Sequence, residues 1–144
     1  MEGACLPESP LDVAVSVIEA NGRYLITQRL PNDSFGGTWE FPGGKPNPGE
    51  PLTECLIREM KEELGILVSV GEKLQEIEHP YPTRTIRLHC FACRIVEGEP
   101  RAIECATWRW VTPEELRGYP FPPASHPLIV LLQSCSRVDK SEGP

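Results

Sequence analysis

The sequence predicts an α+β fold, an α/β/α sandwich in which a central sheet is covered by at least two helices. β-Branched and apolar runs bounded by Gly, Pro and Asn recur along the chain, residues 51–64 have helical apolar spacing, and residues 128–134 form a second apolar helical segment. A chain of 144 residues can bury one core. We therefore predict one domain at residues 11–135, with an N-terminal extension, 1–10, and a polar tail, 136–144.

The first predicted element is a β-hairpin. Residues 13–18 and 24–27 are apolar and β-branched runs, and Asn21-Gly22 between them favours a tight turn. Residues 30–38 are rich in Pro, Asn, Asp, Ser and Gly, which predicts an irregular loop of the kind that often borders a site.

A short strand is predicted at residues 39–41. Pro42, Gly43 and Gly44 end it, and the glycines permit close backbone approaches that a side chain would forbid. The following helix is predicted to have Pro51 at its first position and to end with Gly65 as its cap.

This helix is predicted to have two distinct faces. The apolar face, expected to be buried, comprises Ile57, Met60 and Leu64. The acidic face comprises Glu59, Glu62 and Glu63. Because like charges at this spacing repel, the cluster suggests a bound cation, and an oxygen-only set suits Mg²⁺ or Mn²⁺. The alternative is a solvated acidic surface.

The second half of the chain predicts more strands. They lie at residues 74–78, 85–96 and 107–111, and the Pro-rich residues 79–83 form a loop between the first two.

Helical segments follow these strands. Residues 112–116 predict a helical turn with Thr112 as its N-cap, and residues 119–127 predict a loop. The apolar helix at residues 128–134 would close over the core, and residues 137–144 are expected to fray.

The composition limits the partners and the compartment. With 14 basic and 21 acidic side chains the net charge is −7, which disfavours nucleic acid and anionic membranes and requires cations for an anionic substrate. We find no signal-peptide pattern at the N-terminus and no apolar run of about 20 residues, so a cytoplasmic protein is expected. Its six cysteines are expected to be free thiols, and Cys90 and Cys93 should point to opposite faces of one strand.

A longer pattern surrounds the acidic face. Residues 44–66 fit Gly-x5-Glu-x7-Arg-Glu-apolar-x-Glu-Glu-x-Gly-apolar at every fixed position. The fixed positions are Gly44, Glu50, Arg58, Glu59, Met60, Glu62, Glu63, Gly65 and Ile66. This pattern is the Nudix box, and the chain resembles the Nudix hydrolases from about residue 13 to about residue 132. The resemblance implies the Nudix fold with a central mixed sheet, and hydrolysis of a nucleoside diphosphate-linked substrate with Mg²⁺, or Mn²⁺, at the box.

The resemblance also implies roles for single residues. Glu59 and Glu63 would be metal ligands, with the carbonyl of Gly43 as a further ligand. Glu62 would ligate the metal or help to activate water. Arg58 would hold a neighbouring glutamate in position, although an ordinary helix salt bridge is the alternative.

Outside the box the chain resembles the MutT-type branch. Matching segments are residues 27–29, 39–45, 97–100 and 121–124. This resemblance implies that Glu104 lies near the metal among the catalytic residues, and that the substrate-binding residues are Arg29, Glu40, Phe41 and Ser125. The implied substrate is a nucleoside triphosphate, cleaved to the monophosphate and pyrophosphate.

The sequence leaves the identity of the base open. Members specific for 8-oxoguanine carry an asparagine where this chain has Ser125, and a serine offers one rotatable hydroxyl in place of an amide. We expect 8-oxo-dGTP as the substrate, with CTP or dCTP as the alternative. A noncatalytic nucleotide-recognition module is a third interpretation, but such modules typically lose box carboxylates. We expect a monomer or a homodimer.

Overall fold

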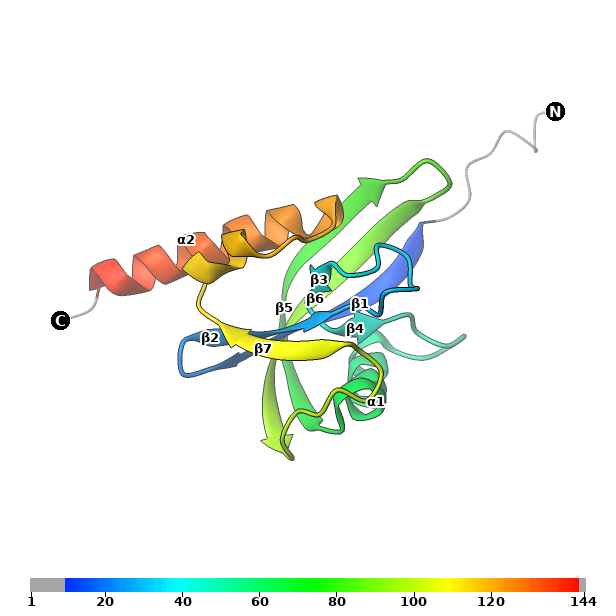
Figure 1. Ribbon diagram of the computed structural model, residues 1–144, viewed down its shortest axis with the longest axis horizontal. Helices are drawn as coiled ribbons and strands as arrows, with labels where there is room; N and C mark the ends of the chain where they lie inside the picture. The colour runs from blue at the N-terminus through cyan, green and yellow to red at the C-terminus, as the bar shows by residue number, and fades with distance from the viewer. Residues whose placement is uncertain (1–9, 143–144) are drawn as a thin grey trace.

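The protein is an α/β/α sandwich, as the sequence predicts (Figure 1). The computed structural model describes the backbone of residues 10–142 and the side chains of residues 10–134. The strands are β1 (Leu11–Ala20), β2 (Arg23–Gln28), β3 (Trp39–Glu40), β4 (Gly43–Gly44), β5 (Leu67–Pro80), β6 (Thr85–Glu97) and β7 (Thr107–Val111). The helices are α1 (Leu52–Leu64), α2 (His126–Glu142) and two 3-10 helices, Glu114–Gly118 and Pro123–Ser125.

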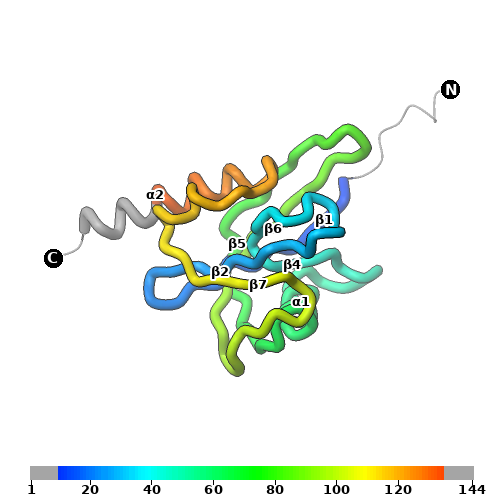
Figure 2. The backbone as a smooth tube through the Cα atoms, viewed as in Figure 1, coloured from blue at the N-terminus to red at the C-terminus, as the bar shows by residue number. Residues whose placement is uncertain are grey.

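A single mixed sheet contains all seven strands of the described chain. β1 is its centre: it pairs in parallel with β6 and antiparallel with β2 and β4. β5 and β6 form a long antiparallel hairpin that crosses the molecule from the side of α1 toward the start of α2 (Figure 2). The predicted central mixed sheet is therefore confirmed.

The two faces of the sheet bury separate cores because successive strand residues point to opposite sides. Val15 and Val17 of β1 pack toward α2 with Leu128, whereas Ala14 and Ile18 of the same strand pack toward α1. Figure 1 shows the two helices on opposite sides of the sheet. No helix in residues 10–142 has the length and apolar character needed to cross a membrane.

The turn between β1 and β2 follows the sequence prediction. Asn21 has φ 55° and Gly22 has φ 77°, the pair of positive angles that a two-residue hairpin turn requires. The short strand β3 is also found where expected, but Gly43 and Gly44 do not simply end it. They form β4, which pairs with Ala14 and Val15.

Helix α1 differs from its prediction at two points. Pro51 is the N-cap with an extended backbone, φ −62° and ψ 149°, and does not occupy the first helical position. Leu56 is fully buried with Met60 and Leu64, whereas Ile57 is half-buried. The rotation of the helix against the sheet decides which of two adjacent apolar residues is buried.

The predicted ends of three other elements were wrong. β5 begins at Leu67 and continues through His79 and Pro80, because it pairs with β6 along its whole length despite register shifts. α2 begins at His126 and continues to Glu142, so the helix predicted at residues 128–134 is longer at both ends. The helical turn predicted at residues 112–116 is a 3-10 helix at Glu114–Gly118, and Thr112 and Glu115 exchange hydrogen bonds of 2.8 and 3.3 Å in a capping box at its start. Residues 1–9 lie outside the described chain.

The cysteines are placed as expected where the structure describes them. Cys55, Cys90, Cys93 and Cys105 are free thiols, and the predictions for Cys5 and Cys135 fall on side chains outside the described part. Cys90 belongs to the core under α2 and Cys93 to the core under α1, so they face away from each other. Burial raises the pKa of each to about 12.

Candidate active site

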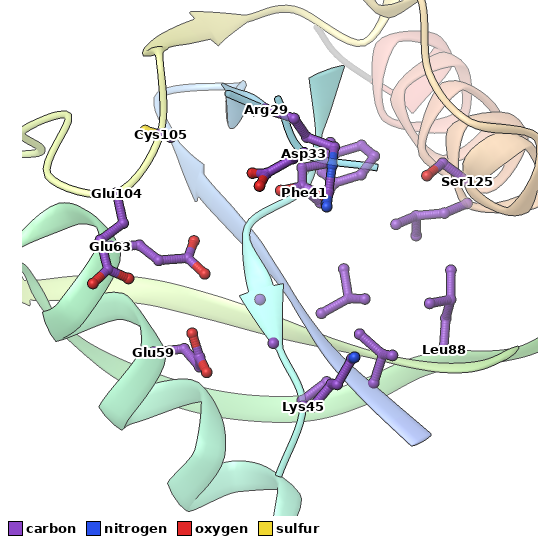
Figure 3. A pocket seen from close by; sticks show the side chains of 17 residues that line it. Arg29, Asp33, Phe41, Lys45, Glu59, Glu63, Leu88, Glu104, Cys105 and Ser125 are labelled. Carbon is purple, nitrogen blue, oxygen red and sulfur yellow. The ribbon is translucent and has the colours of Figure 1, made fainter. Parts of the chain in front are cut away.

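One cavity of about 470 Å³ opens between the start of α2, the centre of the sheet and helix α1 (Figure 3). Its wall has two chemically different ends. One end carries the carboxylates of Glu59, Glu63 and Glu104. The other end is mostly apolar and is formed by Val13, Val15, Phe41, Leu88, Leu128 and Ser125.

Two separate segments supply the carboxylates. Glu59 and Glu63 lie one turn apart on α1, while Glu104 lies in the loop before β7. Backbone hydrogen bonds fix this loop to the end of the helix: the N–H groups of Ile103 and Glu104 donate to the carbonyl of Glu63 at 3.1 and 3.2 Å. The fold therefore brings together three acidic residues that the sequence separates.

The glycines of β4 allow the helix and the central strand to approach closely. A Cβ atom at Gly43 would overlap the carbonyl of Ala14, and one at Gly44 would overlap the carboxylate of Glu59. Only glycine fits at both positions without movement of the neighbouring atoms. Gly43, the predicted carbonyl ligand, consequently lines the same cavity as Glu59 and Glu63.

The carboxylates strongly affect one another. Burial raises the pKa of Glu63, and its hydrogen bond with Glu59 and the charges of Glu40, Glu59 and Glu104 raise it further. Burial also raises the pKa of Glu40, although the charge of Arg29 opposes that shift. A buried carboxylate surrounded by others favours either a proton or a cation as its partner.

The donor chemistry of this end fits a hard divalent cation. Carboxylate oxygens are the ligands that Mg²⁺ and Mn²⁺ prefer, and a cation would relieve the mutual repulsion around Glu63. Within residues 10–134, however, no three His, Cys, Asp or Glu side chains already converge as a metal site. Binding would require the glutamate side chains to adjust their rotamers.

Arg58 connects the start of α1 with its acidic face. Its guanidinium donates two hydrogen bonds of 2.9 Å to Glu50, one of 3.1 Å to Glu59, and two of 3.3 and 3.4 Å to the two carboxylate oxygens of Glu62. The bidentate contact with Glu50 was not part of the predicted role, and its cause is the loop before Pro51, which returns Glu50 to the helix. Hydrogen bonds from Arg58 and from the Asn47 backbone lower the pKa of Glu50 to about 2.

Glu62 lies apart from the other predicted metal ligands. Its side chain is 47% exposed, contacts Arg58, and is not part of the cavity wall. Its role in ligation or water activation stays a prediction.

The predicted substrate-binding residues do converge on the cavity. Phe41 is buried and stacks on Phe121, with ring centroids 5.5 Å apart. Arg29 forms a 2.7 Å ion pair with Glu40, and both line the cavity, as does Ser125. Each of these residues reaches the cavity from a different part of the chain.

Sequence reasoning missed several other residues of the wall. They are Asp33, Lys45, Leu88, Cys105 and Leu128. Lys45 could have been found because it directly follows the Gly43-Gly44 pair. The others belong to no motif, and only the packing of loops and strands brings them to the cavity.

The comparisons with known proteins agree on one family. A family model described as NUDIX domain matches residues 13–131. The CTP pyrophosphohydrolase of Escherichia coli (strain K12) is 37% identical over 119 residues, which cover 83% of this chain and 88% of the relative. The 8-oxo-dGTP diphosphatase of the same organism is 33% identical over 124 residues, which cover 85% of this chain and 96% of the relative.

Solved structures agree with this result. The crystal structure of a MutT protein from Methanosarcina mazei Go1 has a TM-score of 0.76 and is 25% identical, covering 95% of this chain and 99% of that chain. The similarity therefore extends over almost the whole of both chains.

Proposed function

The chain belongs to the Nudix hydrolase family, and from this premise we propose that it hydrolyses a nucleoside triphosphate to the monophosphate and pyrophosphate. The observation that carries this proposal is the division of one cavity into a carboxylate end and an apolar, aromatic end. Metal and phosphates suit the first end, and the flat faces of a nucleobase suit the second. The net charge of −7 supports a small anionic substrate bound with metal rather than nucleic acid.

Each residue has a role in this proposal. Glu59, Glu63 and the carbonyl of Gly43 would hold Mg²⁺, or Mn²⁺ in its place, and Glu104 would complete the acidic wall. When bound, the metal would neutralise phosphate charge and lower the pKa of the attacking water. Glu62 would take a proton from water or add a ligand.

The neighbouring residues would orient these groups and the substrate. Arg58, held by Glu50, positions the carboxylate of Glu59 through its 3.1 Å contact. Phe41 offers its ring to the base, and Arg29 with Glu40 forms the polar edge of the cavity beside it.

We propose 8-oxo-dGTP as the substrate, with CTP or dCTP as the second candidate. The relatives named above act on each of these classes by their names. Ser125 favours CTP or dCTP. This residue at the apolar end of the cavity carries a hydroxyl group, whereas 8-oxoguanine-specific members typically have an asparagine here.

The test measures pyrophosphate release with Mg²⁺ across 8-oxo-dGTP, dGTP, dCTP, CTP and dATP, and compares kcat/KM. Glu63→Gln and Glu62→Gln are each expected to lower turnover by about a hundredfold or more. Glu54→Gln is the matched control, since Glu54 is exposed on the same helix and lies outside the cavity.

The outcomes separate the alternatives. Wild-type activity in Glu63→Gln would contradict the metal site, and wild-type activity in Glu62→Gln would remove that residue from the catalytic set. Nucleotide binding without any turnover would favour a recognition module over an enzyme.

A further inference from the structure

Asp33 is a cavity residue to which no role has yet been given. It lies in the loop between β2 and β3, and Figure 3 shows it beside Arg29 and Phe41, away from Lys45. Its carboxylate makes no hydrogen bond with any part of the chain that the structure describes, although its own N–H donates to the carbonyl of Leu30 at 3.1 Å. The residue is exposed and lines the cavity, so its carboxylate is free to accept a hydrogen bond from a bound ligand.

Several hydrogen bonds hold the loop that carries Asp33. The Arg29 N–H donates to the carbonyl of Thr38 at 2.9 Å, and the Nε of Arg29 donates to the carbonyl of Ser34 at 2.6 Å. Gly36 lies so close to the Pro31 carbonyl that a Cβ atom would overlap it. These contacts hold the backbone on both sides of Asp33 and reduce the entropy lost when its side chain binds a partner.

The neighbouring polar groups are already paired. Arg29 donates to Ser34 and to Glu40, and the Glu40 carboxylate accepts from Arg29 at 2.7 Å. Asp33, which lies beside Arg29 and Phe41, and Ser125 are two polar side chains that line the cavity outside this ion pair. An ionised carboxylate can only accept hydrogen bonds, whereas a serine hydroxyl can donate or accept.

The charge of Asp33 indicates which part of a nucleotide it would contact. An unpaired carboxylate repels phosphate oxygens, so it suits the base rather than the triphosphate. It also repels the carbonyl oxygens on a base edge and attracts its N–H donors. Cytosine differs from uracil, and guanine from hypoxanthine, by an exocyclic amino group.

We propose that Asp33 is a specificity-determining residue that accepts a hydrogen bond from the exocyclic amino group of the substrate base. The inference rests on the proposed nucleotide hydrolysis and deepens it. The site would favour amino-bearing bases over their oxo or unsubstituted analogues, because only the amino group offers the carboxylate a donor at that edge, whereas an oxo group would place two acceptors against each other.

The experiment compares two pairs of substrates that differ at the amino group, CTP with UTP and dGTP with dITP, in the wild type and in Asp33→Asn. The wild type is expected to prefer the amino-bearing member of the pair that it uses. In Asp33→Asn the ratio of kcat/KM values should fall by at least about tenfold, because an amide can also donate to a carbonyl oxygen. Glu72→Gln, which removes an equal charge from an exposed position on β5, should leave the ratio unchanged.

A second readout does not depend on turnover. The affinity for the monophosphates CMP and UMP, or dGMP and dIMP, should change in the same direction, and the Mn²⁺ affinity should not change. An unaltered ratio, a wild-type preference for UTP or dITP, or a weakened Mn²⁺ affinity would each overturn the proposal. If the wild type hydrolyses no nucleotide, the proposed function fails; if it hydrolyses them with a ratio that Asp33→Asn does not change, only this inference fails.

Discussion

The fold strongly raises the pKa of Glu63. This residue lies on α1 between Glu59 and Glu104, and burial with these neighbours raises its pKa. In the unfolded chain this glutamate has an ordinary pKa near 4.5 and loses its proton above that pH. In the folded protein it keeps the proton to a higher pH. Without metal, the stability of the wild type should therefore fall as the pH rises from about 4.5 toward the raised pKa.

Glu63→Gln should remove this pH-dependent loss of stability. In chelator, the free energy of unfolding of the variant should depend less on pH above 4.5 than that of the wild type, and the variant should be the more stable at pH 8. Urea denaturation at several pH values measures both. Mn²⁺ at about 100 times its Kd should stabilise the wild type by roughly 2.7 kcal/mol and the variant by much less. Equal stabilisation of both proteins by Mn²⁺ would contradict the assignment of Glu63 as a ligand.

Glu50 shows the opposite shift. Hydrogen bonds from Arg58 and the Asn47 backbone lower its pKa to about 2, so its contribution to stability is fully present above pH 4.5 and is lost as the pH falls toward 2. Glu50→Gln should be less stable than the wild type at pH 7, and the difference should shrink between pH 4.5 and 2. Thermal unfolding across this range measures it, and a constant difference would argue against the ion pair as its cause.

At the scale of elements, helix α1 is defined by its ends as well as by its faces. Gly65 has φ 69°, and hydrogen bonds from the cap reach the carbonyls of Lys61 and Met60, which gives the left-handed C-cap predicted from the sequence. A Cβ atom there would also lie 2.8 Å from the guanidinium of Arg101. Because that guanidinium is the end of an exposed, flexible side chain, it can move aside, and the backbone conformation is the main reason for glycine here.

Gly65→Ala should therefore destabilise the protein by about 1–2 kcal/mol in urea denaturation, because alanine is strained at a left-handed position. Gly118→Ala is the control: a Cβ atom at Gly118 would have no neighbour within 4 Å, and the residue has no positive φ, so its substitution should be neutral or slightly stabilising. A similar loss in both variants would show that general loss of glycine, and not the cap, is responsible.

β5 is an element that the sequence only partly predicted. It forms one edge of the sheet, and its register shifts between Val70 and Gln75 coincide with the exposed charges of Glu72 and Lys73. Bulges and charges of this kind discourage pairing with a second sheet edge. The same irregularity weakens the alternation of apolar residues, which explains why the beginning of β5 was missed.

The whole molecule consists of two cores separated by one sheet. Ile18 is fully buried toward α1, and Ile26 is fully buried toward α2. We expect Ile18→Val and Ile26→Val each to cost about 0.5–1.5 kcal/mol and their costs to add within about 0.5 kcal/mol. Urea denaturation of the single and double variants measures this, and a larger coupling would show that the sheet transmits strain between its faces.

Much of the candidate site could be predicted because its box occupies one helix and the loop before it. The spacing of Glu59 and Glu63 places both on one face of α1, and the glycine pair of β4 indicates a close approach. The assignment of Glu104 and Ser125 to the site was predicted only from the family resemblance. The partner of Arg58, the outward position of Glu62 and the position of Asp33 could not be derived from spacing.

The sequence by itself determined most of the elements, the family and the oxygen-rich donor set, because periodicity, turn residues and a fixed-position motif all act within short stretches of chain. The tertiary structure decided which of these side chains share a cavity. Sheet packing sets the rotation of α1, and long-range backbone hydrogen bonds bring Glu104 to Glu63. Contacts between distant segments depend on the packing of the whole chain, and no local pattern encodes them.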